Sequence, residues 1–176
     1  MQALLLALSV AASAADAPAP KPKHTWQATK AAVELSIQTL RKKAPKNSGV
    51  DWWKAARQPW DFAVKMEKLQ DAVCAAVVRR AESEEPVIAE RERRATAART
   101  VGDFRKHAAY GVFIPHRMRE LAEGDPASSV VADLFVPLMT EKEMEQRDRV
   151  LVAETGLTAA EYASLASVEE AKLPRK

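Results

Sequence analysis

The chain has 176 residues, enough for one domain with its own core, and its hydrophobic fraction of 47% and charged fraction of 29% are ordinary for a globular protein. The formal net charge is only +3, and basic and acidic residues are interspersed, which argues against a dedicated nucleic-acid binder. The single cysteine, Cys74, excludes an intramolecular disulfide, a multi-cysteine metal site and a CxxCH haem attachment.

The N-terminus, residues 1–15, has the pattern of a secretory signal peptide. The apolar run 3–12 has the length of the hydrophobic segment of such peptides, and Ala12-Ser13-Ala14 fits a cleavage site. No Lys or Arg precedes the run, which departs from the usual pattern of a bacterial signal peptide. The alternative is a first helix of the folded domain. The Pro/Ala-rich segment 16–24 predicts an extended linker. We therefore expect an exported protein (periplasmic, secreted or lumenal) with no transmembrane span in the mature chain.

Apolar residues at helical spacing predict the first half of the folded domain. One stripe predicts a helix over 25–43. Asp51 is placed to cap a short second helix, and Pro59 to begin a longer third helix in its first turn, where a missing amide costs nothing. Apolar residues at steps of three and four predict that this longer helix extends to 81–84. Pro86 is expected to end or kink it.

The middle of the chain predicts further helices with short connections. A helix is expected over 86–110, with Gly111 as the left-handed residue at its C-terminal end, and a short helix over 115–122. The segment 125–136 is expected to be helical, because Asp-Pro is a good helix start. Its β-branched part, 128–136, is also the best strand candidate, but no second strand is available to pair with it.

The C-terminal third carries clear signals for two helices. Gly156 is expected to end the first of them, and the second runs to about Val168 before a polar tail over 169–176. Their N-termini are marked by two capping boxes, Thr140 with Glu143 and Thr158 with Glu161. The sequence therefore predicts an all-α fold: a single compact bundle of about five to seven helices over 25–168.

Two pairs of histidine and carboxylate form the sharpest chemical pattern. Asp103 lies four residues before His107, and His116 lies four residues before Glu120, so each pair shares a helix face. If the turn expected at Gly111 brought the pairs together, they would suit a divalent transition metal. The alternatives are ordinary surface pairs or, because no nucleophile stands beside them, a less supported general acid and base.

Clustered tryptophans are the best hint of a binding surface. Trp52 and Trp53 are adjacent, so they cannot both point inward from one helix, and we expect one of them to be partly exposed to a partner. The alternative is that the cluster, which includes Trp60, anchors a corner of the core. Trp60 itself is expected to be buried.

Cys74 lies beside the apolar seam of the third predicted helix, next to Val73 and one turn before Val77. Such a cysteine usually behaves as a small buried apolar residue. The alternatives are a reactive thiol or an intermolecular disulfide, and the second of these leaves a homodimer possible.

The absence of cofactor motifs shapes the functional hypothesis. The sequence has no Gly-rich phosphate loop, and the alternating Glu and Arg residues over 90–94 are typical of a solvated face. The leading hypothesis is an exported, non-enzymatic helical protein that binds a macromolecular partner, protein rather than nucleic acid, as an accessory, structural or chaperone-like factor. The alternative is a bundle that binds a small ligand or a divalent metal, and an enzyme is the third possibility. No cofactor is expected.

Overall fold

The computed structural model describes residues 25–44, 46, 48–125 and 128–174, and this part of the chain contains helices and no β-strand. The predicted all-α fold is therefore confirmed. The predicted signal peptide 1–15 and the predicted linker 16–24 lie outside the described residues. The helices are α1 (Trp26–Lys43), α2 (Trp52–Glu84), α3 (Ile88–Ala108), the π-helical turn η1 (Ala109–Phe113), α4 (Ile114–Glu123), α5 (Ser129–Leu134), α6 (Glu141–Glu154) and α7 (Ala159–Lys172).

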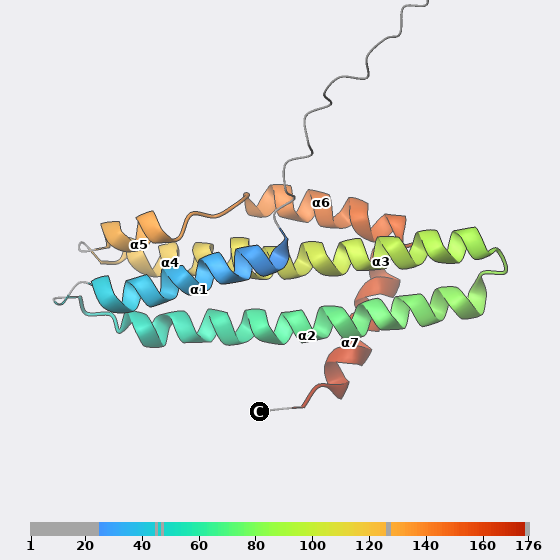
Figure 1. The fold of residues 1–176 in the computed structure, drawn as a ribbon, viewed down its shortest axis with the longest axis horizontal. Helices are drawn as coiled ribbons and strands as arrows, with labels where there is room; N and C mark the ends of the chain where they lie inside the picture. Colours follow the sequence, from blue (N-terminus) through green and yellow to red (C-terminus); the bar gives the residue numbers. More distant parts are fainter. Residues whose placement is uncertain (1–24, 45, 47, 126–127, 175–176) are drawn as a thin grey trace, which may run out of the picture.

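Two long antiparallel rods form the frame of the molecule. The first is α2, whose 33 residues span about 50 Å. The second is α3, η1 and α4, which follow one another without a break and run back beside α2 (Figure 1). The other helices pack at the two ends of this frame. At one end α1 and α5 lie against α4 and η1, and at the other α6 packs on α3 while α7 crosses α2 (Figure 1). No helix in the described ranges is long and apolar enough to cross a membrane.

Helix starts and stops follow the sequence signals at several points. The Asp51 side chain accepts a hydrogen bond from the amide of Lys54, 3.1 Å away, and caps α2. Both predicted capping boxes are present, because Thr140 and Thr158 each exchange hydrogen bonds with the Glu three residues later. Gly156 ends α6 with a φ of 76°, a left-handed conformation that favours glycine.

Pro59 does not begin a helix, contrary to the sequence-based expectation. It lies inside α2, which runs unbroken from Trp52 to Glu84. A proline at this depth removes one backbone hydrogen bond, but burial on both sides of it favours the continuous helix. Trp52 and Ala56 are buried before Pro59, and Ala63 is buried after it.

Gly111 does not end a helix either, and its φ is not positive. It lies within η1, and the chain continues as a helix into α4. Burial favours the continuous helix, because Tyr110, Val112 and Ile114 are almost fully buried. Pro115 has no amide hydrogen to donate to the carbonyl of Gly111, as a regular helix would require. The amide of Leu138 donates to that carbonyl instead, at 3.0 Å. A π-helical turn thus replaces the predicted chain reversal.

Two further boundaries differ from the predicted ones. Helix α5 begins at Ser129 rather than at the Asp-Pro pair, and α7 runs to Lys172 instead of ending near Val168. The extra turn of α7 is anchored, because Glu169 is buried and accepts a hydrogen bond from Lys172.

Arg94 also departs from the expected solvated face: it is buried, and its Nε donates to the carbonyl of Thr155 at 2.9 Å.

The apolar interior is divided into two cores along the frame. The first core lies among α1, the N-terminal half of α2, η1, α4 and α5, and includes Leu40, Trp52, Tyr110, Ile114, Met118 and Phe135. The second core lies among the C-terminal half of α2, α3, α6 and α7, and includes Val73, Val77, Val101, Val152, Leu157 and Tyr162. Met66 packs against both, so the two cores meet at the middle of α2.

Candidate functional site

The two adjacent tryptophans of α2 lie in opposite environments. Trp52 is 2% exposed in the first core, and its indole Nε1 donates to the hydroxyl of Ser48 at 3.0 Å. Trp53 is 47% exposed, and the guanidinium of Arg41 lies over its ring, 4.9 Å from the centroid. The expectation that one of the pair is exposed is confirmed. Trp60 is half-buried rather than buried, with its ring edge-on to Tyr110 at 5.3 Å.

Trp53 borders a groove between α1 and α2, here called the Trp53 groove, with a volume of about 300 Å³. Both helices contribute residues at steps of three and four, so one face of each helix forms one wall. The two indoles stand on the α2 side, and the apolar floor includes Ile37. The lining residues are Glu34, Ile37, Gln38, Trp53, Ala56, Arg57, Trp60 and Asp61.

Charges at the rim of the Trp53 groove are unevenly paired. Arg57 and Asp61 lie 3.8 Å apart and form an exposed ion pair within one helix. Glu34, on the opposite wall, makes no ion pair with any residue that the structure describes. The groove therefore combines aromatic walls with one carboxylate that an incoming cation can approach.

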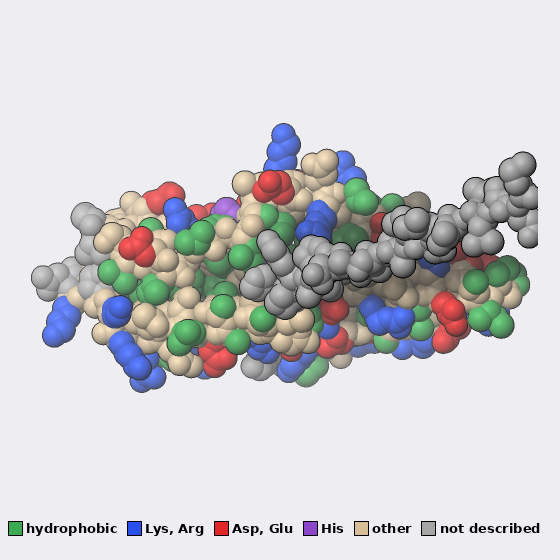
Figure 2. All heavy atoms as spheres, turned by 45° about the horizontal axis from the view of Figure 1, so that its top comes forward, with side chains coloured by type: hydrophobic (Ala, Val, Ile, Leu, Met, Phe, Trp, Pro, Cys, Tyr) green, Lys and Arg blue, Asp and Glu red, His purple; other side chains and the backbone are tan. Residues whose placement is uncertain are grey.

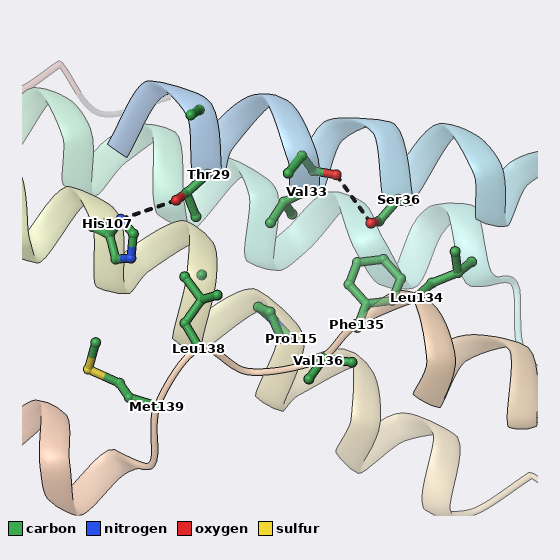
Figure 3. A pocket seen from close by; sticks show the side chains of 13 residues that line it. Thr29, Val33, Ser36, His107, Pro115, Leu134, Phe135, Val136, Leu138 and Met139 are labelled. Atoms are coloured by element: carbon green, nitrogen blue, oxygen red, sulfur yellow. Dashed lines mark hydrogen bonds between the residues drawn. The ribbon is translucent and has the colours of Figure 1, made fainter. Parts of the chain in front are cut away.

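A second cavity lies on another face of α1, between that helix, η1 and the segment that connects α5 to α6. We call it the π-turn cleft, and its volume is about 430 Å³ (Figure 3). Thr29 and His107 face one another at one end, where the Thr29 hydroxyl and the His107 Nδ1 are 3.1 Å apart. Phe135, Leu138 and Met139 approach from the connecting segment.

The four residues of the metal hypothesis are not assembled into one site. Within the described ranges, no three His, Cys, Asp or Glu side chains are grouped closely enough to hold a metal ion. Asp103 lies 3.9 Å from the ammonium of Lys106, and Glu120 lies 2.5 Å from the guanidinium of Arg117. His107 contacts Thr29, as described above.

The continuous helix explains why the two histidines stay apart. His107 and His116 were expected to approach one another across a turn at Gly111, but η1 carries the helix through that point. Nine residues of helix place them about 13 Å apart along the axis, too far for one ion. His116 lies on α4, where its Nε2 is buried without a hydrogen-bond partner among the described residues.

Cys74 is half-buried rather than buried, and it faces the second core from α2. Burial raises the pKa of its thiol, which disfavours the nucleophilic thiolate. Nearby, burial also raises the pKa of Tyr162 to about 12. These groups lack the lowered pKa that a reactive thiol or an acid–base pair would need at neutral pH.

The sequence predicted that one of the two adjacent tryptophans is exposed, but it did not predict the π-turn cleft. Adjacency alone showed that Trp52 and Trp53 must differ in exposure. The cleft, in contrast, joins residues from α1, α3, η1, α4, α5 and the connection that follows α5, and their meeting depends on the π turn. The one local signal was Pro115 placed four residues after Gly111, which leaves a helix carbonyl without its usual donor.

Comparisons with known proteins place this chain in no family. They found no matching family model, no similar curated protein and no similar solved structure.

Proposed function

We propose that this protein is a non-enzymatic binding factor, exported from the cytoplasm, that recognises a protein partner through the Trp53 groove. The observation that carries the proposal is the half-exposed indole of Trp53, 47% of it open to solvent beside a groove. Tryptophan and arginine are the residue types most enriched among interface hot spots, and here Arg41 is stacked on the ring. The stacking also fixes the indole before any partner arrives.

The size and charge of the Trp53 groove define the partner. A volume of about 300 Å³ is at the lower end for ligand pockets, which suits one inserted side chain rather than a large cofactor. The indoles of Trp53 and Trp60 favour an aromatic or long aliphatic group. Glu34 adds a preference for a neighbouring Lys or Arg. The expected partner is thus a protein segment that presents one large apolar side chain beside a basic one.

A displayed library of random peptides tests this proposal on the full-length protein. We expect enrichment of peptides that carry a large apolar residue next to Lys or Arg. Trp53→Ala should weaken the binding of the selected peptides by about 30-fold or more, the effect of a hot spot worth about 2 kcal/mol. Glu34→Gln should weaken them less and reduce the salt dependence of binding, because it removes only a rim charge.

Phe62→Ala is the matched control for that experiment. Phe62 lies on the same helix and is 43% exposed, close to the value for Trp53, but it does not line the Trp53 groove. Its truncation should leave peptide affinity unchanged. The proposal fails if no peptide is enriched above background, or if the enriched peptides bind Trp53→Ala as tightly as the natural sequence.

A further inference from the structure

The π-turn cleft is a candidate ligand site that shares no residue with the Trp53 groove. Its lining residues are Ala28, Thr29, Ala32, Val33, Ser36, His107, Gly111, Pro115, Leu134, Phe135, Val136, Leu138 and Met139, and none of them is Asp, Glu, Lys or Arg. Helix α1 contributes to both sites, but from different faces. With a volume of about 430 Å³, the cleft lies within the range of small-molecule pockets.

The backbone holds the walls of the cleft in place. Because Pro115 leaves the Gly111 carbonyl without a helical donor, the amide of Leu138 binds there, and this bond fastens the α5–α6 connection against η1. Phe135 anchors the other end of that connection in the first core, where it is almost fully buried. Because Gly111 has no side chain, Leu138 and Thr29 can both lie close to the backbone of η1. A Cβ at position 111 would lie 2.8 Å from the Thr29 Cγ2.

Apolar side chains remain exposed at the mouth of the cleft. Val136 is 63% exposed and Leu138 is 54% exposed, although both belong to a segment that is fixed to the helices. On the face drawn in Figure 2, hydrophobic side chains gather over the half of the molecule that contains α1 and α5, with charged side chains around them. A ligand that enters the cleft would remove part of this apolar surface from water, which is favourable.

Polar side chains stand at two places in the cleft: Thr29 and His107 face one another at one end, and Ser36 lies further along α1, towards Phe135 (Figure 3). The Ser36 hydroxyl donates to the carbonyl of Ala32 within its own helix, at 3.2 Å. The Thr29 hydroxyl contacts His107 Nδ1, and a hydroxyl can take part in more than one hydrogen bond. Thr29 therefore remains able to bond to a polar group of a ligand, while most of the other lining side chains are apolar.

We propose that the π-turn cleft binds an uncharged small molecule: a compact aromatic or short hydrocarbon body that carries one hydroxyl group. The hydrocarbon body lies among Val33, Pro115 and Phe135, and the hydroxyl pairs with Thr29. A charged ligand is disfavoured, because the lining contains no Asp, Glu, Lys or Arg side chain to pair with it and an unpaired ion loses its hydration on burial.

Equilibrium dialysis of 2-naphthol against the full-length protein tests this site. We expect saturable binding of one equivalent, weaker binding of naphthalene, and no saturable binding of the 2-naphthoate anion. Thr29→Val should weaken the binding of 2-naphthol by about threefold to tenfold, the effect of one net hydrogen bond. It should leave the binding of naphthalene unchanged. Failure of 2-naphthol to saturate, or tighter binding of 2-naphthoate, would overturn the proposal.

Two matched variants on α1 locate the binding site. Ala32 lines the cleft from a solvent-exposed position, so Ala32→Phe should fill the cleft without disturbing the core and weaken 2-naphthol at least ~10-fold. Ala31→Phe makes the same change one residue earlier, outside the lining, and should bind like the natural sequence. Trp53→Ala should also retain binding. Equal loss in the two phenylalanine variants, or loss in Trp53→Ala, would show that the cleft is not the site.

Discussion

At the scale of single residues, the most informative group is the carboxylate of Glu67, at the boundary between the two cores. It accepts hydrogen bonds from the ammonium of Lys30 and the hydroxyl of Tyr110, each at 2.7 Å. Burial alone would raise the pKa of Glu67, but these two bonds and the nearby charge of Lys106 outweigh it and lower the pKa. The ionised form of Glu67 therefore stabilises the fold.

Glu67→Gln should lower the free energy of unfolding at neutral pH and leave it less sensitive to acid. A carboxyl group whose pKa is lower in the folded state contributes stability above its unfolded pKa, about 4.3, and loses that contribution as the pH falls through the folded value. The difference between the variant and the natural sequence should therefore shrink below about pH 4. Urea unfolding across this range measures it, with Glu145→Gln, an exposed carboxylate on α6, as the control. A difference that stays constant with pH would show a packing effect only.

At the scale of elements, the sequence predicted a helix end correctly where the residues that form that end lie close together in the chain. Thr140, Thr158 and Gly156 behave as expected, because capping and left-handed geometry involve residues within one turn. Pro59 and Gly111 behave otherwise, because burial of neighbouring side chains and a hydrogen bond from Leu138 decide the outcome. These influences come from residues far along the chain, which a local pattern cannot show.

Gly111→Ala tests the packing at η1. A Cβ there would collide with Leu138 and crowd Thr29, so the variant should lose about 1–3 kcal/mol of unfolding free energy, as overpacked sites do. Gly49→Ala is the control, because nothing lies within 4 Å of a Cβ at that position. Chemical denaturation compares the two. If Gly111→Ala is as stable as Gly49→Ala, the connection from α5 to α6 is not packed against η1 as described.

At the scale of the whole molecule, the composition and periodicity were enough to predict an all-α fold. They did not predict that α3, η1 and α4 form one rod, nor that the interior divides into two cores along it. That division depends on which helices pair, and pairing reflects contacts between distant segments. The same limit applies to the candidate sites: the exposure of one tryptophan followed from the sequence, but its groove required the packing of α1 on α2.

Export is a proposal about the chain as a whole, and the N-terminus of the native protein tests it. Cleavage after Ala14 or Ala15 would follow from the apolar run and the Ala-Ser-Ala pattern. N-terminal sequencing of protein purified from its own source should therefore find Ala15 or Asp16 first. Intact Met1 or Gln2 on the bulk of the protein would contradict export.

Thermal unfolding of Trp52→Ala and Trp53→Ala, measured side by side, tests whether Trp53 belongs to a binding surface or to the core. If Trp53 serves a partner, the fold does not depend on it, whereas Trp52 belongs to the first core. Trp52→Ala should lower the free energy of unfolding by about 3–5 kcal/mol, the usual cost of removing a buried large aromatic side chain. Trp53→Ala should lose no more than about 1 kcal/mol, the contribution of an exposed cation–π contact with Arg41. Equal losses in the two variants would show that both indoles hold the fold together, and would contradict a binding role for Trp53.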